Sequence, residues 1–346
     1  VGRLTAYQQS SHGQTPQLPA KTTSIRQWAQ RLVEYAQSDE IREELGYWQA
    51  ALGQDPAPLP IDNLNGDKSQ ADAPRPTDHE SHFTPNTEAS ARSVTVALGA
   101  EETSALLQEV PATYHSEIND ALLTATAQTL AAWSGSRTVL IDVEGHGRED
   151  LLEGLDVSRT VGWFTAMYPL RLLLPEGAGP GEALSAVREQ LRKVPRRGIG
   201  WGLLRYLSND ERIRARMAAL PQPEVSFNYL GQLDHALPGP SPFRPAPEST
   251  GEERSPKGQR PHRLQVSGAV VGGQLRMVWA YSQDLHRQET IERLAAGLVE
   301  ALRALIAHCR SAQAARPSRA TSLVTNLSEK EIAALVAELN EARQND

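Results

Sequence analysis

A glutamate and an arginine stand together where an apolar segment of the sequence ends. Residues 138–143 have a nearly continuous apolar centre, which predicts a buried strand, and Glu144-Gly145-His146-Gly147-Arg148 follows directly. The glycines on either side of the histidine predict a tight turn. Glu144 should therefore lie at the end of the strand, where polar side chains commonly face a cleft. An exposed salt bridge between Glu144 and Arg148 is the alternative.

A second candidate is a polar pair inside another apolar strand. Residues 225–230 have the composition of a strand, and Asn228 and Tyr229 interrupt its apolar run. A hydrogen-bonded pair within the core is the alternative reading of these two side chains. Neither this pair nor Glu144 with Arg148 specifies a reaction by itself.

Other candidate sites fail on spacing or context. The glycines at 198, 200 and 202 lack the spacing and the preceding long strand of a dinucleotide-binding fingerprint, so a structural loop is expected there. His79 and His82 lack the spacing of a zinc-binding helix and lie in a polar segment, so no metal site is expected. Cys309 falls near the end of a helical segment and is expected to be a small buried residue rather than a nucleophile.

Composition narrows the function classes further. The chain has 346 residues, a net charge of −7 and 39% hydrophobic residues, which is typical of a soluble globular protein. Nucleic acid is not expected as a partner, because phosphate binding requires clustered basic residues. The single cysteine fits a reducing cytosol, so a cytoplasmic location is expected. The longest apolar runs are far shorter than the roughly 20 residues of a membrane-spanning helix.

The elements that must position these residues are both helical and extended. Helical spacing of apolar residues predicts helices over 24–52, 118–133, 184–194 and 291–305, and a short one from residue 101. Strands are predicted at 93–98, 138–143 and 225–230, and a hairpin over 264–281 that turns at Gly272-Gly273. Because strands and helices do not alternate strictly, the pattern predicts an α+β fold.

Several segments, read together, resemble the epimerization domains of non-ribosomal peptide synthetases, which belong to the condensation-domain superfamily. The matching segments are Ile141–Glu149, Asp156–Thr165 with Tyr168-Pro169, Pro195–Gly202, Phe227–Gln232, Ala20–Ser24 with Trp28, and Glu117–Asp120. The match covers about residues 1–312, in order. The Glu-Gly-His-Gly-Arg run and the Gly-Trp-Phe-Thr segment favour epimerization over condensation.

The resemblance implies a fold like that of chloramphenicol acetyltransferase, in which two lobes meet around a tunnel. Residues 1–92 would be a remnant of the first lobe, and residues 93–312 an essentially complete second lobe carrying the motifs. Residues 313–346 would be a linker. It ends in a short amphipathic helix at Leu327–Arg343, which either docks the next synthetase subunit or is a plain linker helix.

The implied reaction is inversion of the α-carbon of an aminoacyl or peptidyl thioester, in the biosynthesis of peptide antibiotics. The substrate arrives on the 4′-phosphopantetheine arm of a peptidyl carrier domain, and the thioester acidifies the α-proton, so no cofactor of the domain's own is expected. Glu144 suits the role of general base or general acid, since burial raises the pKa of a carboxyl group toward neutral pH. Arg148 would hold Glu144 in place, while Asn228 and Tyr229 would position the substrate or stabilise its enolate oxygen.

One departure from the family pattern concerns the opposing acid–base group. Such domains carry a His-His-x-x-x-Asp motif upstream of the segments matched here, and the sequence contains no His-His pair. We therefore expect an N-terminally truncated chain that lacks the histidine side of the site and is inactive alone. The other interpretations are a condensation domain that forms peptide bonds, and a scaffold that docks a carrier domain without catalysis. A downstream condensation domain or synthetase subunit is expected as a further partner.

Overall fold

One mixed β-sheet forms the centre of the protein. The computed structural model describes residues 20–53, 57–62, 86–149, 151–235 and 253–314, with scattered residues between 7 and 18 and between 246 and 251. Within these residues the sheet has the strand order β1-β6-β5-β4-β2-β3. The strands are β1 (Ala91–Ala97), β2 (Thr138–Gly145), β3 (Ala166–Leu173), β4 (Val225–Gln232), β5 (Leu264–Val271) and β6 (Gln274–Ser282).

Parallel and antiparallel pairing coexist in this sheet. Strand β4 runs parallel to both β2 and β5, whereas β1, β6 and β3 pair antiparallel with their neighbours. The predicted hairpin is confirmed, since β5 and β6 are joined at Gly272 and Gly273, whose φ angles of 61° and 71° suit glycine. The carboxylate of Asp234 accepts hydrogen bonds from both glycine amides, at 2.7 and 3.0 Å.

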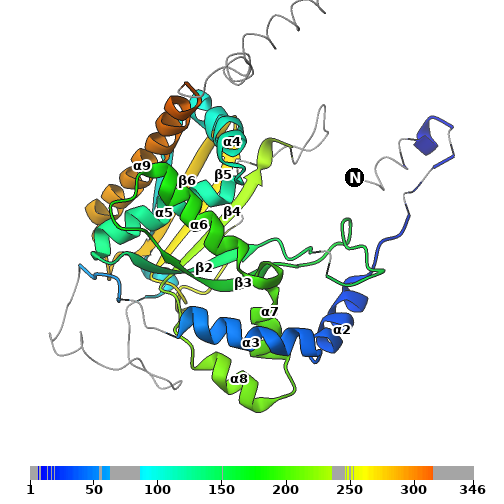
Figure 1. The fold of residues 1–346 in the computed structure, drawn as a ribbon. Helices are drawn as coiled ribbons and strands as arrows, with labels where there is room; N and C mark the ends of the chain where they lie inside the picture. Colours follow the sequence, from blue (N-terminus) through cyan, green and yellow to red (C-terminus); the bar gives the residue numbers. More distant parts are fainter. Residues whose placement is uncertain are drawn as a thin grey trace, which may run out of the picture.

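Helices cover one face of the sheet (Figure 1). They are α4 (Ala100–Tyr114), α5 (Ile118–Ser134), α6 (Pro180–Arg192) and α9 (Gln288–Ala314). Helix α5 lies in the middle of this layer and buries most of its length, whereas α6 and α9 are amphipathic. The apolar stripes that predicted α5, α6 and α9 are thus confirmed, as is the α+β class.

A second group of helices lies beside the edge strand β3 (Figure 1). They are α2 (Ile25–Tyr35), α3 (Asp39–Leu52), α7 (Ile199–Gly202) and α8 (Glu211–Ala218), with a π-helical turn η4 at Leu203–Leu207. Ser24 and Ser38 cap α2 and α3 by accepting hydrogen bonds from backbone amides. The buried rings of Trp48 and Trp201 meet edge to face at 5.3 Å and join α3 to α7.

The sheet presents two different faces. Side chains alternate along a strand, so every second residue points toward the helices. On the helix side lie the fully buried Ile141, Phe227, Val266 and Trp279. On the other side, strands β2, β4 and β5 place Asp142, Glu144, Ser226, Asn228, Gln265 and Ser267. We call this second side the polar face.

Some predictions need correction and others fall outside the described residues. The segment 198–202, expected to be a loop, is helical, because Gly198 ends a left-handed turn and Trp201 packs into the core. The helix from residue 100 is long rather than short, and it continues through Pro111. The segment holding His79 and His82 and the helix proposed at Leu327–Arg343 lie outside the described residues. None of the helices described is long and apolar enough to cross a bilayer.

Candidate active site

Parallel pairing of β2 with β4 brings two of the predicted site residues together. The register pairs Asp142 with Ser226 and Val143 with Phe227, so Glu144 and Asn228 are neighbours on the polar face. Asn228 Nδ2 donates a hydrogen bond to Glu144 Oε2 at 2.6 Å. Such a short bond to a carboxylate is charge-assisted and fixes the orientation of the acceptor.

The surroundings of Glu144 shift its protonation equilibrium. Glu144 is half-buried. Burial raises the pKa of its carboxyl group, while the charge of His262 and the hydrogen bond from Asn228 act in the opposite direction and only partly offset it. A carboxyl group with a raised pKa exchanges protons closer to neutral pH than a free glutamate does. Glu144 therefore has the properties of a general acid or base.

Arg148 does not hold Glu144, contrary to the expectation from sequence. Its guanidinium donates hydrogen bonds to the carbonyl oxygens of Val157 and Thr160, the latter at 2.9 Å, and stacks over the ring of Phe164 at 4.1 Å. The turn after β2 sends the arginine toward the 157–164 loop, so Arg148 ties that loop to the turn. Asn228 takes the place predicted for the arginine.

A glycine makes this turn possible. Gly147 has a φ of 64°, which side-chain-bearing residues adopt only with strain. A Cβ at this position would also lie 1.6 Å from the carbonyl oxygen of Phe164. The backbone of the turn therefore lies directly against Phe164, at the end of the 157–164 loop, and close to Ala166, the first residue of β3.

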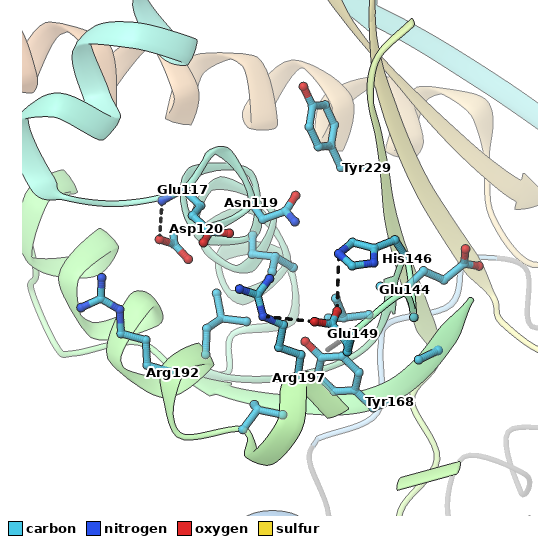
Figure 2. Close-up of a pocket in the computed structure, with 17 residues that line it drawn as sticks. Glu117, Asn119, Asp120, Glu144, His146, Glu149, Tyr168, Arg192, Arg197 and Tyr229 are labelled. Atoms are coloured by element: carbon cyan, nitrogen blue, oxygen red, sulfur yellow. Dashed lines mark hydrogen bonds and ion pairs between the residues drawn. The ribbon is translucent and has the colours of Figure 1, made fainter. Parts of the chain in front are cut away.

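A cavity of about 420 Å³ opens at the same end of β2. It is lined by Glu117, Asn119, Asp120, Leu123, Val143, Glu144, Gly145, His146, Gly147, Glu149, Ala166, Tyr168, Leu191, Arg192, Val194, Arg197 and Tyr229. Figure 2 shows Glu144 at its rim, with the carboxylate directed away from Asn119 and Tyr229. Because side chains alternate along β4, Tyr229 lies on the face opposite to Asn228 and Glu144. The four predicted residues thus divide between two faces and a turn.

Ionisable side chains that line this cavity contact one another (Figure 2). The carboxylate of Glu149 lies 3.4 Å from His146 Nε2 and 3.6 Å from Arg197 Nε. Asp120 is buried, and burial raises the pKa of its carboxyl group although the amide of Glu117 donates to it at 2.8 Å. Burial also raises the pKa of Tyr168 to about 12. The cavity is therefore strongly polar on one wall.

Sequence reasoning missed a buried pair beside Glu144. His262 Nε2 lies 2.7 Å from Asp142 Oδ2, and His262 is 4% exposed. Asp142 appears in the sequence as a polar interruption of the apolar strand that leads to Glu144, which was an available signal. His262 lies in a polar segment before β5 and carries no local signal. Only the strand order brings it to β2.

Comparison with known proteins supplies the family. Residues 4–321 match the condensation domain family. The chain is 42% identical over 309 residues to a linear gramicidin synthase protein of Brevibacillus parabrevis, covering 89% of this chain and 4% of that protein. It is 40% identical over 349 residues to a chondramide synthase of Chondromyces crocatus, covering 99% of this chain and 8% of that protein. The chain therefore spans less than a tenth of the length of these relatives.

Solved structures show the same fold. The epimerization domain from the third module of tyrocidine synthetase B superposes with a TM-score of 0.75 at 34% identity, covering 89% of this chain and 64% of that one. The condensation domain of a monacolin K polyketide synthase superposes with a TM-score of 0.58 at 17% identity, covering 87% and 64%. These matches confirm the chloramphenicol-acetyltransferase-like α+β fold and the resemblance to epimerization domains. With a family match that extends over most of its length, the chain belongs to the condensation-domain family.

Proposed function

We propose that this domain inverts the α-carbon of an aminoacyl or peptidyl thioester carried on the 4′-phosphopantetheine of a carrier domain. The observation that supports this most is Glu144. It is a carboxyl group with a raised pKa, oriented by Asn228 on the polar face of the sheet. The 34% identity to an epimerization domain supports the same assignment.

The reaction requires a base, an acid and a site for the enolate. A base takes the α-proton, the electron pair moves into the thioester carbonyl, and the enolate collapses as a proton is added to the opposite face of the α-carbon. Glu144 performs one of the two proton transfers. A histidine of the His-His-x-x-x-Asp motif, as expected from the resemblance, performs the other. No redox change occurs, and the phosphopantetheine belongs to the substrate.

The remaining predicted residues take supporting roles in this proposal. Asn228 orients Glu144, and Arg148 fixes the turn that follows it. Tyr229 lines the cavity on the other side of the sheet, so it positions a part of the substrate that enters this cavity rather than the reacting carbon. The boundaries proposed from sequence, a partial first lobe over 1–92 and a second lobe over 93–312, are kept as a hypothesis.

The experiment that tests the proposal is deuterium exchange. The complete gene product is incubated in deuterated water with an L-aminoacyl carrier domain, and the α-position is analysed by mass spectrometry. Deuterium is expected to enter the α-position, and Glu144→Gln should slow this entry about 100-fold or more, because a general acid–base group is lost. Glu153→Gln, an exposed glutamate of a nearby loop, is the matched control and should leave the rate unchanged. Full exchange in Glu144→Gln would reject the assignment.

The same assay separates epimerization from condensation. The condensation alternative rests on the family match. A condensation reaction joins two carrier-bound substrates, so a single loaded carrier would show no deuterium entry and no inversion. Addition of a second aminoacyl carrier would then give a peptide. We also expect the 346-residue chain, assayed alone, to show no exchange, because it contains no His-His pair.

A further inference from the structure

The pair formed by Asp142 and His262 lies next to Glu144 on the polar face. Asp142 precedes Glu144 by two residues on β2, so their side chains point the same way and their Cα atoms are about 7 Å apart. His262 contacts Asp142 at 2.7 Å. A positive charge on the His262 ring would therefore attract the Glu144 carboxylate over the two-residue spacing that separates Asp142 from Glu144. Water is partly excluded there, so the attraction is stronger than it would be in bulk solvent.

Hydrogen bonds from other segments fix the backbone around His262. Asn86 Nδ2 donates hydrogen bonds to the carbonyl oxygens of Arg260 and His262, both at 2.9 Å. The amide of the next residue, Arg263, donates to the carbonyl oxygen of Glu224 at 2.8 Å, and their side chains form an ion pair at 2.8 Å. These contacts hold the segment before β5 against the sheet, so the position of His262 does not depend on Asp142 alone.

The charged groups on this part of the polar face are few. Arg260 directs Nη2 to Gln265 Oε1 at 3.1 Å, and Arg171 of β3 lies on the same face. The register partner of Glu144 on β3 is the uncharged Met167. In the described part of β4 and β5, the positions on this face carry neutral side chains. Besides Asp142, His262 is therefore the ionisable group best placed to bias Glu144.

We propose that the Asp142–His262 pair is a positioning pair for Glu144, in which protonated His262 favours the carboxylate form of Glu144 and Asp142 keeps the ring in place. The proposal rests on the proposed function for its role in catalysis, because a base must be ionised before it can accept the α-proton. Burial alone would leave Glu144 protonated over a wider pH range. The Asp142–His262 pair counteracts this effect of burial, so Glu144 can both accept and donate a proton near neutral pH.

The first test is a titration that needs no catalysis. The carboxyl carbon of Glu144 is followed by NMR in the purified chain between about pH 3 and pH 9, and its signal is identified by its loss in Glu144→Gln. His262→Gln is expected to raise the pKa of Glu144, because a nearby positive charge is removed. His308→Gln, an exposed histidine of α9, is the matched control and should leave the curve unchanged. An unchanged Glu144 curve in folded His262→Gln overturns the proposal.

A second measurement covers the case in which His262→Gln does not fold. In the unmodified chain, the Glu144 carboxyl signal and the His262 ring signals should respond to each other as the pH is varied, because the protonation states of interacting groups are coupled. Two independent, single-step curves overturn the proposal as well.

Activity then separates the two proposals. In the complete gene product, His262→Gln should move the acid limb of the exchange rate to higher pH. If Glu144→Gln leaves exchange intact, the proposed function of Glu144 fails while the coupling seen in the titration stands. If Glu144→Gln abolishes exchange and the titration shows no coupling, only the positioning pair fails.

Discussion

The hydrogen bond from Asn228 to Glu144 determines what the carboxylate can do. A donor 2.6 Å from Oε2 stabilises the ionised form and holds the carboxylate plane in one orientation. The bond thus combines two effects that a catalytic base requires, which are a defined direction and a pKa below that of a carboxyl group buried without a partner.

Removal of this donor gives a prediction at the residue scale. Asn228→Ala should raise the pKa of Glu144 further and leave its carboxylate free to rotate. Deuterium entry is expected to fall by about 10- to 100-fold, since roughly 1.4 kcal/mol corresponds to each factor of ten. Ser267→Ala alters the neighbouring position of β5 and should have little effect. Equal rates in Asn228→Ala and the unmodified protein would refute the role of this bond.

Only part of the site could be predicted from residues alone. The apolar run before Glu144 indicated correctly that this residue ends a strand. The expected contact with Arg148 was wrong because a four-residue spacing fixes no direction across a turn that contains a glycine with positive φ. The contact with Asn228 joins residues 84 positions apart, and it depends on β2 and β4 being neighbours. No local pattern contains that information.

At the scale of elements, period-two and period-3.6 patterns identified most strands and helices. Strand β3 was missed because Pro169 and Arg171 interrupt its apolar alternation. Its position at the edge of the sheet tolerates the proline. The segment 195–202 looked like a loop because glycines are poor helix formers. It is nevertheless helical after Gly198, where tertiary packing outweighs propensity.

The turn after β2 yields a prediction about stability. Gly147→Ala should destabilise the protein, because the new Cβ would overlap the carbonyl oxygen of Phe164 at 1.6 Å in a left-handed backbone conformation. Gly135→Ala is the matched control, since Gly135 has a φ of 71° and no heavy atom within 4 Å of the added Cβ. Denaturant unfolding should show Gly147→Ala to be less stable than Gly135→Ala by at least about 2 kcal/mol. Equal stability would mean that the turn relaxes without cost.

At the scale of the whole molecule, a buried histidine links stability to pH. His286, fully buried before α9, packs its ring edge-on against Trp133 at 5.6 Å. Burial lowers its pKa from 6.5 to about 4. The unfolded chain therefore binds a proton at higher pH than the folded chain does, so this contribution is present above about pH 6.5 and is lost as pH falls toward 4.

Replacement of this histidine should flatten the acid side of the stability profile. His286→Phe keeps an aromatic ring against Trp133 and removes the titrating group. Between about pH 6.5 and pH 4, the free energy of unfolding should then fall less than in the unmodified protein, by at most about 3 kcal/mol. Urea unfolding at several pH values measures the slope. Parallel profiles for the two proteins would show that His286 does not titrate on unfolding in this range.

The position of Glu144 on one face of the sheet has a stereochemical consequence. Glu144 is fixed on a rigid strand and approaches only from the polar face, whereas the enolate of the proposed reaction is planar and has two prochiral faces. An acid–base group held on one side of the enolate can exchange protons with one enantiomer of the substrate only. During the first turnover in deuterated water, the label should therefore appear in the inverted product before it appears in recovered starting material. The order in which the two enantiomers acquire deuterium would thus show on which side of the substrate the sheet lies.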